Sequence, residues 1–279
     1  MVVAKIGKIT ITAVTDGAAP SVDPSWPFPK VPPALWGQHQ YALDHKGLHK
    51  SNFGSFIIQV NDDIMLVDTG LGPRPPIKYG NPPSELPQSI KNAGYSLADI
   101  NVVFFTHLHF DHVGWALNHD LKGPYFPNAR YIARKSDWVY WESCKDMSRI
   151  DHIEAFKKTI QPLANLVPLE LIDGETTLLP GISALPTPGH TPGHMSLLLE
   201  SNGDRGIVTG DVFHSPVQFT EPDWSHRADV DPVEARRSRK LILEQLVPGT
   251  TIAAGHLEHT SNIGTVVHIE KKRYWKGFK

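Results

Sequence analysis

Three histidines and one aspartate lie within six residues, directly after an apolar segment at 102–105. The stretch reads His107-Leu108-His109-Phe110-Asp111-His112. In an extended chain, residues two apart project to the same side, so His107 and His109 can hold one cation. Asp111 and His112 follow where the chain turns and can face a second. Imidazole suits zinc-like cations and carboxylate suits harder ones, so this mixture predicts paired divalent metal ions.

Two metal ions need more ligands than this stretch offers, and three residues further along the chain occur in matching settings. His190, Asp211 and His256 each follow a predicted apolar strand and have a glycine directly before them. We expect all three on loops at one edge of a rigid sheet, together with the first four residues.

The elements that must position these residues can be predicted from hydrophobic periodicity and turn residues. Alternation predicts a strand at 5–14, and a hairpin is expected from 54–60 and 64–67. An apolar run predicts a buried strand at 102–105. Helices are expected at 86–93, 136–143 and 231–246, and further strands near 168–172, 182–185, 195–199, 205–209, 251–254 and 265–269. No linker divides the chain, so we expect one domain over 1–279, with 20–50 as a Pro- and Trp-rich, lid-like segment.

Composition excludes several classes of protein. The 27 basic and 29 acidic residues give a net charge of −2, so we expect no nucleic acid partner. The single cysteine, Cys144, excludes an intrachain disulfide and is typical of a reducing compartment. There is no apolar run of about 18 residues and no leader-like N-terminus. We therefore expect a cytoplasmic protein with no membrane partner.

The order of the metal-binding candidates resembles the metallo-β-lactamase-fold hydrolase superfamily from Asp68 to His256. The resemblance implies an α+β fold, an αββα sandwich in which two mixed β-sheets are flanked by helices. It also implies a ligand set: His107, His109 and His190 for the first ion, Asp111, His112 and His256 for the second, and Asp211 as the bridge. Asp68 matches an aspartate that orients a ligand in this family, although it can also cap a turn at 69–70.

The stretch 210–219 and the sequence Asp229-Val230-Asp231-Pro232 resemble the methyl parathion hydrolase branch, which is related to quorum-quenching lactonases. His214 lies three residues after Asp211, where acyl-homoserine lactonases carry a tyrosine that contacts the substrate carbonyl. This departure weighs against a homoserine lactone and leaves other lactones and esters open. An imidazole can also donate a hydrogen bond to a developing oxyanion.

The predicted function is that of a dinuclear metal-dependent hydrolase acting on a small, hydrophobic lactone or ester. Two cations would lower the pKa of a bridging water and supply hydroxide as the nucleophile. We expect Asp111, Asp211 and His214 to take part in catalysis. Zinc is the expected metal, while manganese, iron and cobalt accept the same ligands. The alternatives are a phosphotriesterase, a β-lactamase, and a non-catalytic metal-dependent ligand-binding protein. The resemblance also implies a homodimer.

The remaining candidates are assigned to the surroundings of the site. His194 is expected to support a metal ligand without binding metal itself. Aromatic side chains are expected to wall an apolar pocket, namely Trp26, Trp36, Phe110, Trp115, Phe213, Phe219 and Trp224. The basic residues Arg236, Arg237, Arg239 and Lys240 are expected on the solvated face of a helix.

Overall fold

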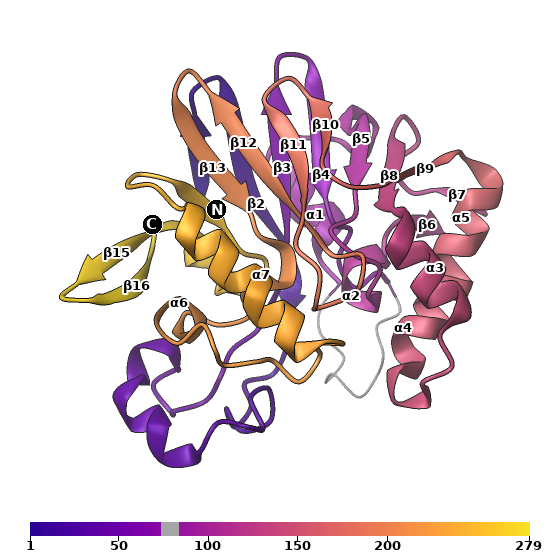
Figure 1. Ribbon diagram of the computed structural model, residues 1–279. Coiled ribbons are helices and arrows are strands. Elements are labelled where there is room, and N and C mark those ends of the chain that lie inside the picture. The colour runs from indigo at the N-terminus through magenta and orange to yellow at the C-terminus, as the bar shows by residue number, and fades with distance from the viewer. Residues whose placement is uncertain (74–83) are drawn as a thin grey trace.

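Two seven-stranded β-sheets lie face to face at the centre of the computed structural model, which describes residues 1–73 and 84–279 (Figure 1). The first sheet has the order β1-β2-β3-β4-β5-β8-β9, with bounds Val3–Ile6, Ile9–Ala18, Asn52–Val60, Asp63–Val67, Val102–Phe104, Arg130–Arg134 and Leu169–Ile172. The second runs from β10 to β16 in sequence order, with bounds Thr176–Leu179, Ile182–Pro186, Met195–Ser201, Asp204–Val208, Thr251–Ala253, Ile263–Ile269 and Lys272–Gly277. A short pair, β6 (Leu117–Asn118) and β7 (Gly123–Pro124), lies outside both sheets.

Helices cover the outer face of each sheet. The first half of the chain supplies α1 (Leu86–Asn92), α2 (Phe110–Val113), α3 (Lys135–Ser143), α4 (Ile150–Ala155) and α5 (Gln161–Leu166). The second half supplies α6 (Val217–Thr220) and α7 (Pro232–Gln245). One apolar core lies between the two sheets. Each sheet has one further apolar core on its outer face, where it packs against its helices. Both sheets mix parallel and antiparallel pairs, which confirms the predicted αββα sandwich.

The strand predicted at 5–14 is in fact a hairpin of β1 and β2. Gly7 has a φ of +55° at the turn, and a Cβ there would lie 2.3 Å from the carbonyl oxygen of Ser201. The apolar spacing changes from two residues to three at this turn, where Ile6 pairs with Ile9, so the pattern is interrupted at the point where the chain reverses. The hairpin predicted at 54–67 is confirmed by the pairing of β3 with β4.

Helix α7 begins and ends close to the predicted bounds. The Asp231 carboxylate accepts hydrogen bonds from the backbone N–H groups of Val233 and Glu234, and Pro232 occupies the first helical position. The prediction that its basic residues all face solvent is wrong for Arg239, which is fully buried. That side chain points toward the loops described below.

Residues 20–50 form an irregular segment beside α6 (Figure 1). Two short 3₁₀ helices, Pro33–Gln38 and Gln40–Ala42, are its only regular elements of helix. A small apolar cluster joins Phe28 and Trp36 to Val217 of α6. This apolar cluster therefore anchors the segment 20–50 to α6 in the second half of the chain.

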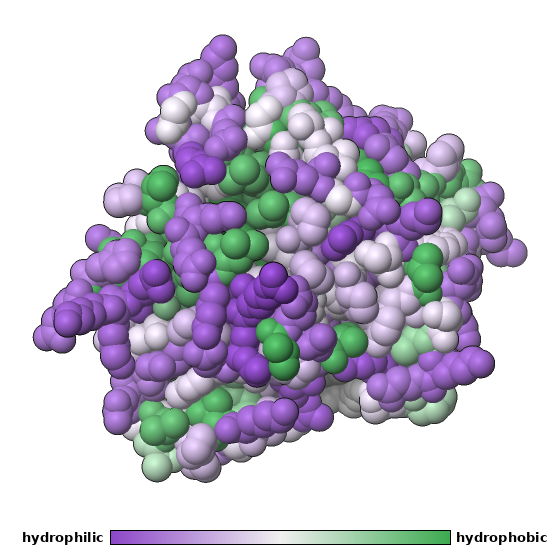
Figure 2. Space-filling model, viewed as in Figure 1, coloured by the Kyte–Doolittle hydropathy of each residue, from purple (hydrophilic) through white to green (hydrophobic). Residues whose placement is uncertain are grey.

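The outer surface is largely hydrophilic on the face shown in Figure 2, where apolar side chains form small, separate patches. Among the described residues, no helix is both long and apolar enough to span a bilayer.

Candidate metal centre

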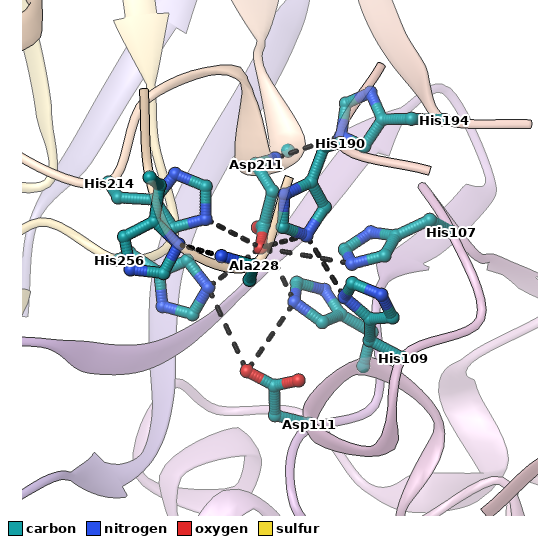
Figure 3. A network of polar contacts seen from close by, with 12 residues as sticks. His107, His109, Asp111, His190, His194, Asp211, His214, Ala228 and His256 are labelled. Atoms are coloured by element: carbon teal, nitrogen blue, oxygen red, sulfur yellow. Dashed lines mark hydrogen bonds and ion pairs between the residues drawn. The ribbon is translucent and has the colours of Figure 1, made fainter. Parts of the chain in front are cut away.

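The structure brings the seven predicted metal ligands together at one edge of the two sheets (Figure 3). Residues 107–112 follow β5 of the first sheet and continue into α2. His190 follows β11, Asp211 follows β13 and His256 follows β14, all in the second sheet. Each half of the fold therefore contributes side chains to one cluster, and loops at strand ends hold them.

The cluster divides into two groups that share one carboxylate. His107, His109, His190 and Asp211 each place one donor atom within 4.8 Å of the others. Asp111, His112 and His256 do the same. These two groups correspond to the ligand sets that the family resemblance implied for two ions.

Asp211 contacts both groups through its carboxylate oxygens. Oδ2 lies 2.9 Å from Nε2 of His256 and 3.1 Å from Nε2 of His190. Oδ1 lies 3.4 Å from Nε2 of His112. A carboxylate between two sets of imidazoles is the arrangement expected of a bridging ligand.

The donor atoms are arranged as a cation would require. Nδ1 of His109 and Nε2 of His190 lie 2.9 Å apart, so both nitrogens point into the same space at the centre of the cluster. Nε2 of His107 and Nε2 of His112 are buried and accept no hydrogen bond from the described residues. Since buried polar atoms are normally paired, these orphaned nitrogens fit divalent cations bound by nitrogen and oxygen ligands.

The protein's own charges set the protonation of the cluster. Burial lowers the pKa of His107 and of His109 well below the usual value, so both offer a neutral lone pair. For His190, burial acts in the same direction, but the Asp211 and Asp229 carboxylates outweigh it and raise the pKa to about 9. Cation binding must therefore displace a proton from His190.

The ring nitrogens that point away from the cluster are held by hydrogen bonds. Nδ1 of His112 lies 2.8 Å from Oδ2 of Asp68, and Nδ1 of His256 lies 2.8 Å from the carbonyl oxygen of Asn52. These acceptors fix the tautomer with the proton on Nδ1, so Nε2 faces the centre. Asp68 has a left-handed φ of +63° and also accepts hydrogen bonds from the backbone and hydroxyl of Thr106.

His194 acts on Asp211 through the backbone. Its Nε2 lies 2.9 Å from the N–H of Asp211 and accepts its hydrogen bond, while Nδ1 lies 2.9 Å from the Thr187 hydroxyl. Burial lowers the pKa of His194 to about 3, so the ring stays neutral and keeps its acceptor. The predicted supporting position of His194 agrees with these contacts.

Asp137, at the start of α3, was missed by the sequence analysis. Its side chain is fully buried; Oδ2 accepts from the N–H of Leu108 at 2.7 Å and Oδ1 from the N–H of Gly193 at 2.9 Å. It thus ties the loop carrying His107 and His109 to the loop following His190. In the sequence, an aspartate in a first helical turn is too common to signal this role.

Asp229 and Arg239 form a second support that sequence patterns did not identify as such. Oδ1 of Asp229 lies 3.1 Å from Nδ1 of His190, and Oδ2 lies 3.9 Å from Nη2 of Arg239. Nε of Arg239 donates to the carbonyl oxygen of Val212, next to Asp211. One buried guanidinium therefore contacts the surroundings of two candidate ligands.

His214 lies beside the cluster in a stack of imidazoles. Its ring is 3.8 Å from that of His226 and 5.0 Å from that of His256, with interplanar angles of 11° and 13°. Nε2 lies 3.2 Å from Oδ2 of Asp211, yet neither ring nitrogen makes a hydrogen bond to a described residue. Burial lowers the pKa of His214 to about 4, so the ring is neutral.

A cavity of about 740 Å³ opens over the cluster, with Asp211, His214 and His256 in its wall. This volume suits a small molecule. Of the seven aromatic residues expected to wall a pocket, Trp26 and Phe110 line the cavity, and Phe53, which was not predicted, joins them. The other five are instead packed into apolar cores: Trp36, Trp115, Phe213, Phe219 and Trp224.

Comparison with known proteins identifies the family. The family model described as the metallo-beta-lactamase superfamily matches residues 55–256, a range that contains all seven candidate ligands and Asp68. The chain belongs to the metallo-β-lactamase superfamily, as the resemblance implied.

Named relatives match only part of the chain. An N-acyl homoserine lactonase of Bacillus sp. is 33% identical over 120 residues, which are 43% of this chain and 40% of that protein. An N-acyl homoserine lactonase of Bacillus thuringiensis is 29% identical over 156 residues, 56% of this chain and 54% of that protein. The chain thus spans about half the length of the curated relatives it matches.

Solved structures share the fold over nearly the whole chain. AidC, described as a dizinc quorum-quenching lactonase in complex with the product N-hexanoyl-L-homoserine, aligns with a TM-score of 0.82 and 23% identity, covering 100% of this chain and 97% of AidC. A hydrolase of the beta-lactamase superfamily, AbOPH, aligns with a TM-score of 0.83 and 25% identity over 99% of this chain and 97% of AbOPH.

Proposed function

We propose that this chain is a dinuclear metal-dependent hydrolase that opens a small lactone or a related ester. The observation that carries the proposal is the position of Asp211, whose carboxylate contacts both groups of donors in the wall of the cavity. The names of the matched relatives, N-acyl homoserine lactonases, support a lactone as the substrate.

Seven side chains would hold the ions. We assign His107, His109 and His190 to one ion, Asp111, His112 and His256 to the other, and Asp211 to both. Two bound divalent ions supply Lewis acidity that activates water near neutral pH and polarises the substrate carbonyl. Zinc fits the imidazole-rich donor set, and manganese, iron and cobalt accept the same atoms.

The chain's own groups complete the chemistry. His214 is neutral at pH 7 because burial lowers its pKa, and it therefore carries one ring N–H. We assign this N–H to the carbonyl oxygen of the substrate as negative charge develops there. Asp211 accepts a hydrogen bond from the attacking water, and Asp111, whose side chain is 11% exposed in the cavity wall, exchanges protons with the reacting groups.

Metal analysis combined with a substrate panel tests this function. Protein loaded with zinc, manganese or cobalt is assayed on γ- and δ-lactones, aryl esters, a phosphotriester and a chromogenic β-lactam. The proposal predicts the highest kcat/KM on lactones or esters, abolished by a chelator and restored by metal. Highest activity on the phosphotriester or the β-lactam would identify the corresponding alternative. A metal-loaded protein without turnover on any of them would indicate a ligand-binding protein.

Two further features remain predictions. A cytoplasmic location is supported by the single cysteine, Cys144. The homodimer is supported by the family resemblance alone, and sedimentation of the metal-loaded protein would test it.

A further inference from the structure

Two arginines line the cavity apart from the candidate metal ligands. Arg149 ends the short 3₁₀ helix Met147–Arg149, and Arg227 lies in the loop before α7. Among the described residues that line the cavity, the carboxylates are those of Asp111 and Asp211, both in the cluster. The outer wall is therefore positively charged, although the chain as a whole has a net charge of −2.

Arg149 is held by contacts on part of its guanidinium, and the rest of the guanidinium has no hydrogen-bond partner among the described residues. Its side chain is 17% exposed, and Nη1 donates to the carbonyl oxygen of Ala228 at 3.1 Å. Nε lies 3.5 Å from a carboxylate oxygen of Asp146, whose own side chain is 52% exposed and so screened by water. Nη2 makes no hydrogen bond to any described residue, so this edge of the guanidinium can bind a ligand.

Arg227 is oriented by the segment 20–50. Its guanidinium lies 4.3 Å from the ring centre of Trp26, and its backbone N–H donates to the carbonyl oxygen of Pro27 at 2.8 Å. No carboxylate within the described part of the chain lies within 4 Å of it. Nη1 donates to the carbonyl oxygen of Trp26 at 3.5 Å, and the remaining N–H groups of the stacked guanidinium make no hydrogen bond to a described residue and can bind an anion.

The Arg149 guanidinium contacts the backbone directly beside Arg227. Arg149 is bonded to the carbonyl oxygen of Ala228, and Arg227 is the residue before it. Apolar side chains line the same cavity, including Ala19, Val22, Phe53 and Phe110. The cavity that contains the candidate metal ligands therefore also presents apolar surface and two guanidinium groups to a ligand.

We propose that the substrate carries a carboxylate at the end remote from the bond that is broken, and that Arg149 and Arg227 recognise it. The inference rests on the hydrolase function proposed above and narrows it to lactones or esters with a hydrocarbon spacer and a terminal carboxylate. The planar, forked guanidinium matches a carboxylate in both geometry and charge.

A matched pair of substrates tests the proposal on the metal-loaded protein. Mono-4-nitrophenyl adipate ends in a carboxylate, whereas 4-nitrophenyl adipamate has the same length and ends in a neutral carboxamide. We expect the wild type to show kcat/KM about tenfold higher on the carboxylate, mainly through a lower KM. Added NaCl should reduce this ratio, because part of the attraction is screened.

Substitutions assign the preference to the two arginines. Arg149→Gln and Arg227→Gln should each lower the carboxylate-to-carboxamide ratio about threefold to tenfold, and the double variant should bring it close to one. Arg149→Lys keeps the charge and should retain part of the ratio. Arg237→Gln is the matched control, since Arg237 lies on α7 with a side chain that is 80% exposed and does not line the cavity.

The outcomes separate this inference from the function on which it rests. If the metal-loaded wild type cleaves neither substrate nor any lactone, the proposed hydrolase function fails. If it cleaves both equally, the carboxylate inference is wrong and the hydrolase function stands. If the wild type prefers the carboxylate but the single and double variants keep the full carboxylate-to-carboxamide ratio of kcat/KM, the two arginines do not bind the carboxylate. Their assignment is then overturned.

Discussion

Arg239 and Asp229 form an ion pair in which neither side chain is exposed to solvent, with Nη2 3.9 Å from Oδ2. Burying two charges is costly, and the structure offsets the cost with hydrogen bonds from Arg239 to the carbonyl oxygens of Val212, Pro222 and Trp224. Burial lowers the pKa of Arg239 to about 10, so it keeps its charge at neutral pH. The pair thus connects α7 to two neighbours of the candidate ligands: Asp229 contacts His190, and Arg239 binds the carbonyl oxygen of Val212, next to Asp211.

Removing one member of this pair should be strongly destabilising. Arg239→Met leaves Asp229 buried without its cation, and we expect the free energy of unfolding to fall by about 3–5 kcal/mol. Denaturant unfolding of the metal-loaded protein measures it. Arg237→Met, on the exposed face of the same helix, should change stability by less than about 0.5 kcal/mol. Equal stability of the two variants would contradict a structural role for the buried pair.

Asp137→Asn should weaken metal binding without touching a ligand. The carboxylate accepts one backbone N–H on each oxygen, whereas the amide has one acceptor and presents its NH₂ group to the other N–H. We expect a loss of about 1–3 kcal/mol in stability and about tenfold or more in metal affinity. Competition with a chromogenic chelator measures the affinity. Asp231→Asn, which keeps an N-cap acceptor on α7, is the control, and the same affinity in both variants would refute the tie between the two loops.

Replacing Asp211 should reduce metal content and turnover together, whereas replacing His214 should reduce turnover alone. Asp211→Asn removes the charge shared by the two groups of donors and should reduce both metal content and turnover. His214→Ala should retain both metals and lower kcat by roughly tenfold to a thousandfold, the range of one oxyanion donor. Metal analysis beside steady-state kinetics distinguishes them. Unchanged kcat in a fully metallated His214→Ala protein would leave His214 without a catalytic role.

Metal content should approach two divalent ions per chain. His112→Ala should lower occupancy of the second site more than that of the first, because His112 belongs to the group with Asp111 and His256. Elemental analysis after dialysis gives the count. A chelator should also lower the melting temperature, since at 100 times Kd a bound ion contributes about 2.7 kcal/mol of stability. A single ion in fully loaded protein would count against the dinuclear proposal.

The segment 20–50 should affect binding more than chemistry. Trp26 lines the cavity and its side chain is 48% exposed, so Trp26→Ala removes wall area without disturbing the cluster around Phe28 and Trp36. We expect KM for bulky apolar esters to rise severalfold, with little change for small activated esters. Equal losses on both kinds of ester would indicate that Trp26 supports the fold rather than the pocket.

The parts of the site that sequence could predict are those encoded locally. Apolar strands ending in Gly-flanked histidines and aspartates led to His190, Asp211 and His256, because strand ends at one sheet edge converge. Asp137 could not be found in this way, because its partners at Leu108 and Gly193 are 29 and 56 residues away. Arg239 was misassigned for a related reason: its helix has basic residues on several sides, and only tertiary packing decides which of them is buried.

Asn52 and His256 are 204 residues apart in the sequence and are joined by hydrogen bonds. The backbone N–H of Asn52 donates to the carbonyl oxygen of His256 at 3.2 Å, and the Asn52 amide donates to that of Gly255 at 2.9 Å. The next contact is so close that a Cβ on Gly54 would lie 2.5 Å from the oxygen of Gly255. A growing chain on the ribosome therefore carries four of the five candidate histidine ligands before it can close this contact. A chain that stops before His256 would carry the other six candidate ligands without the hydrogen bonds that join the two sheets at this edge.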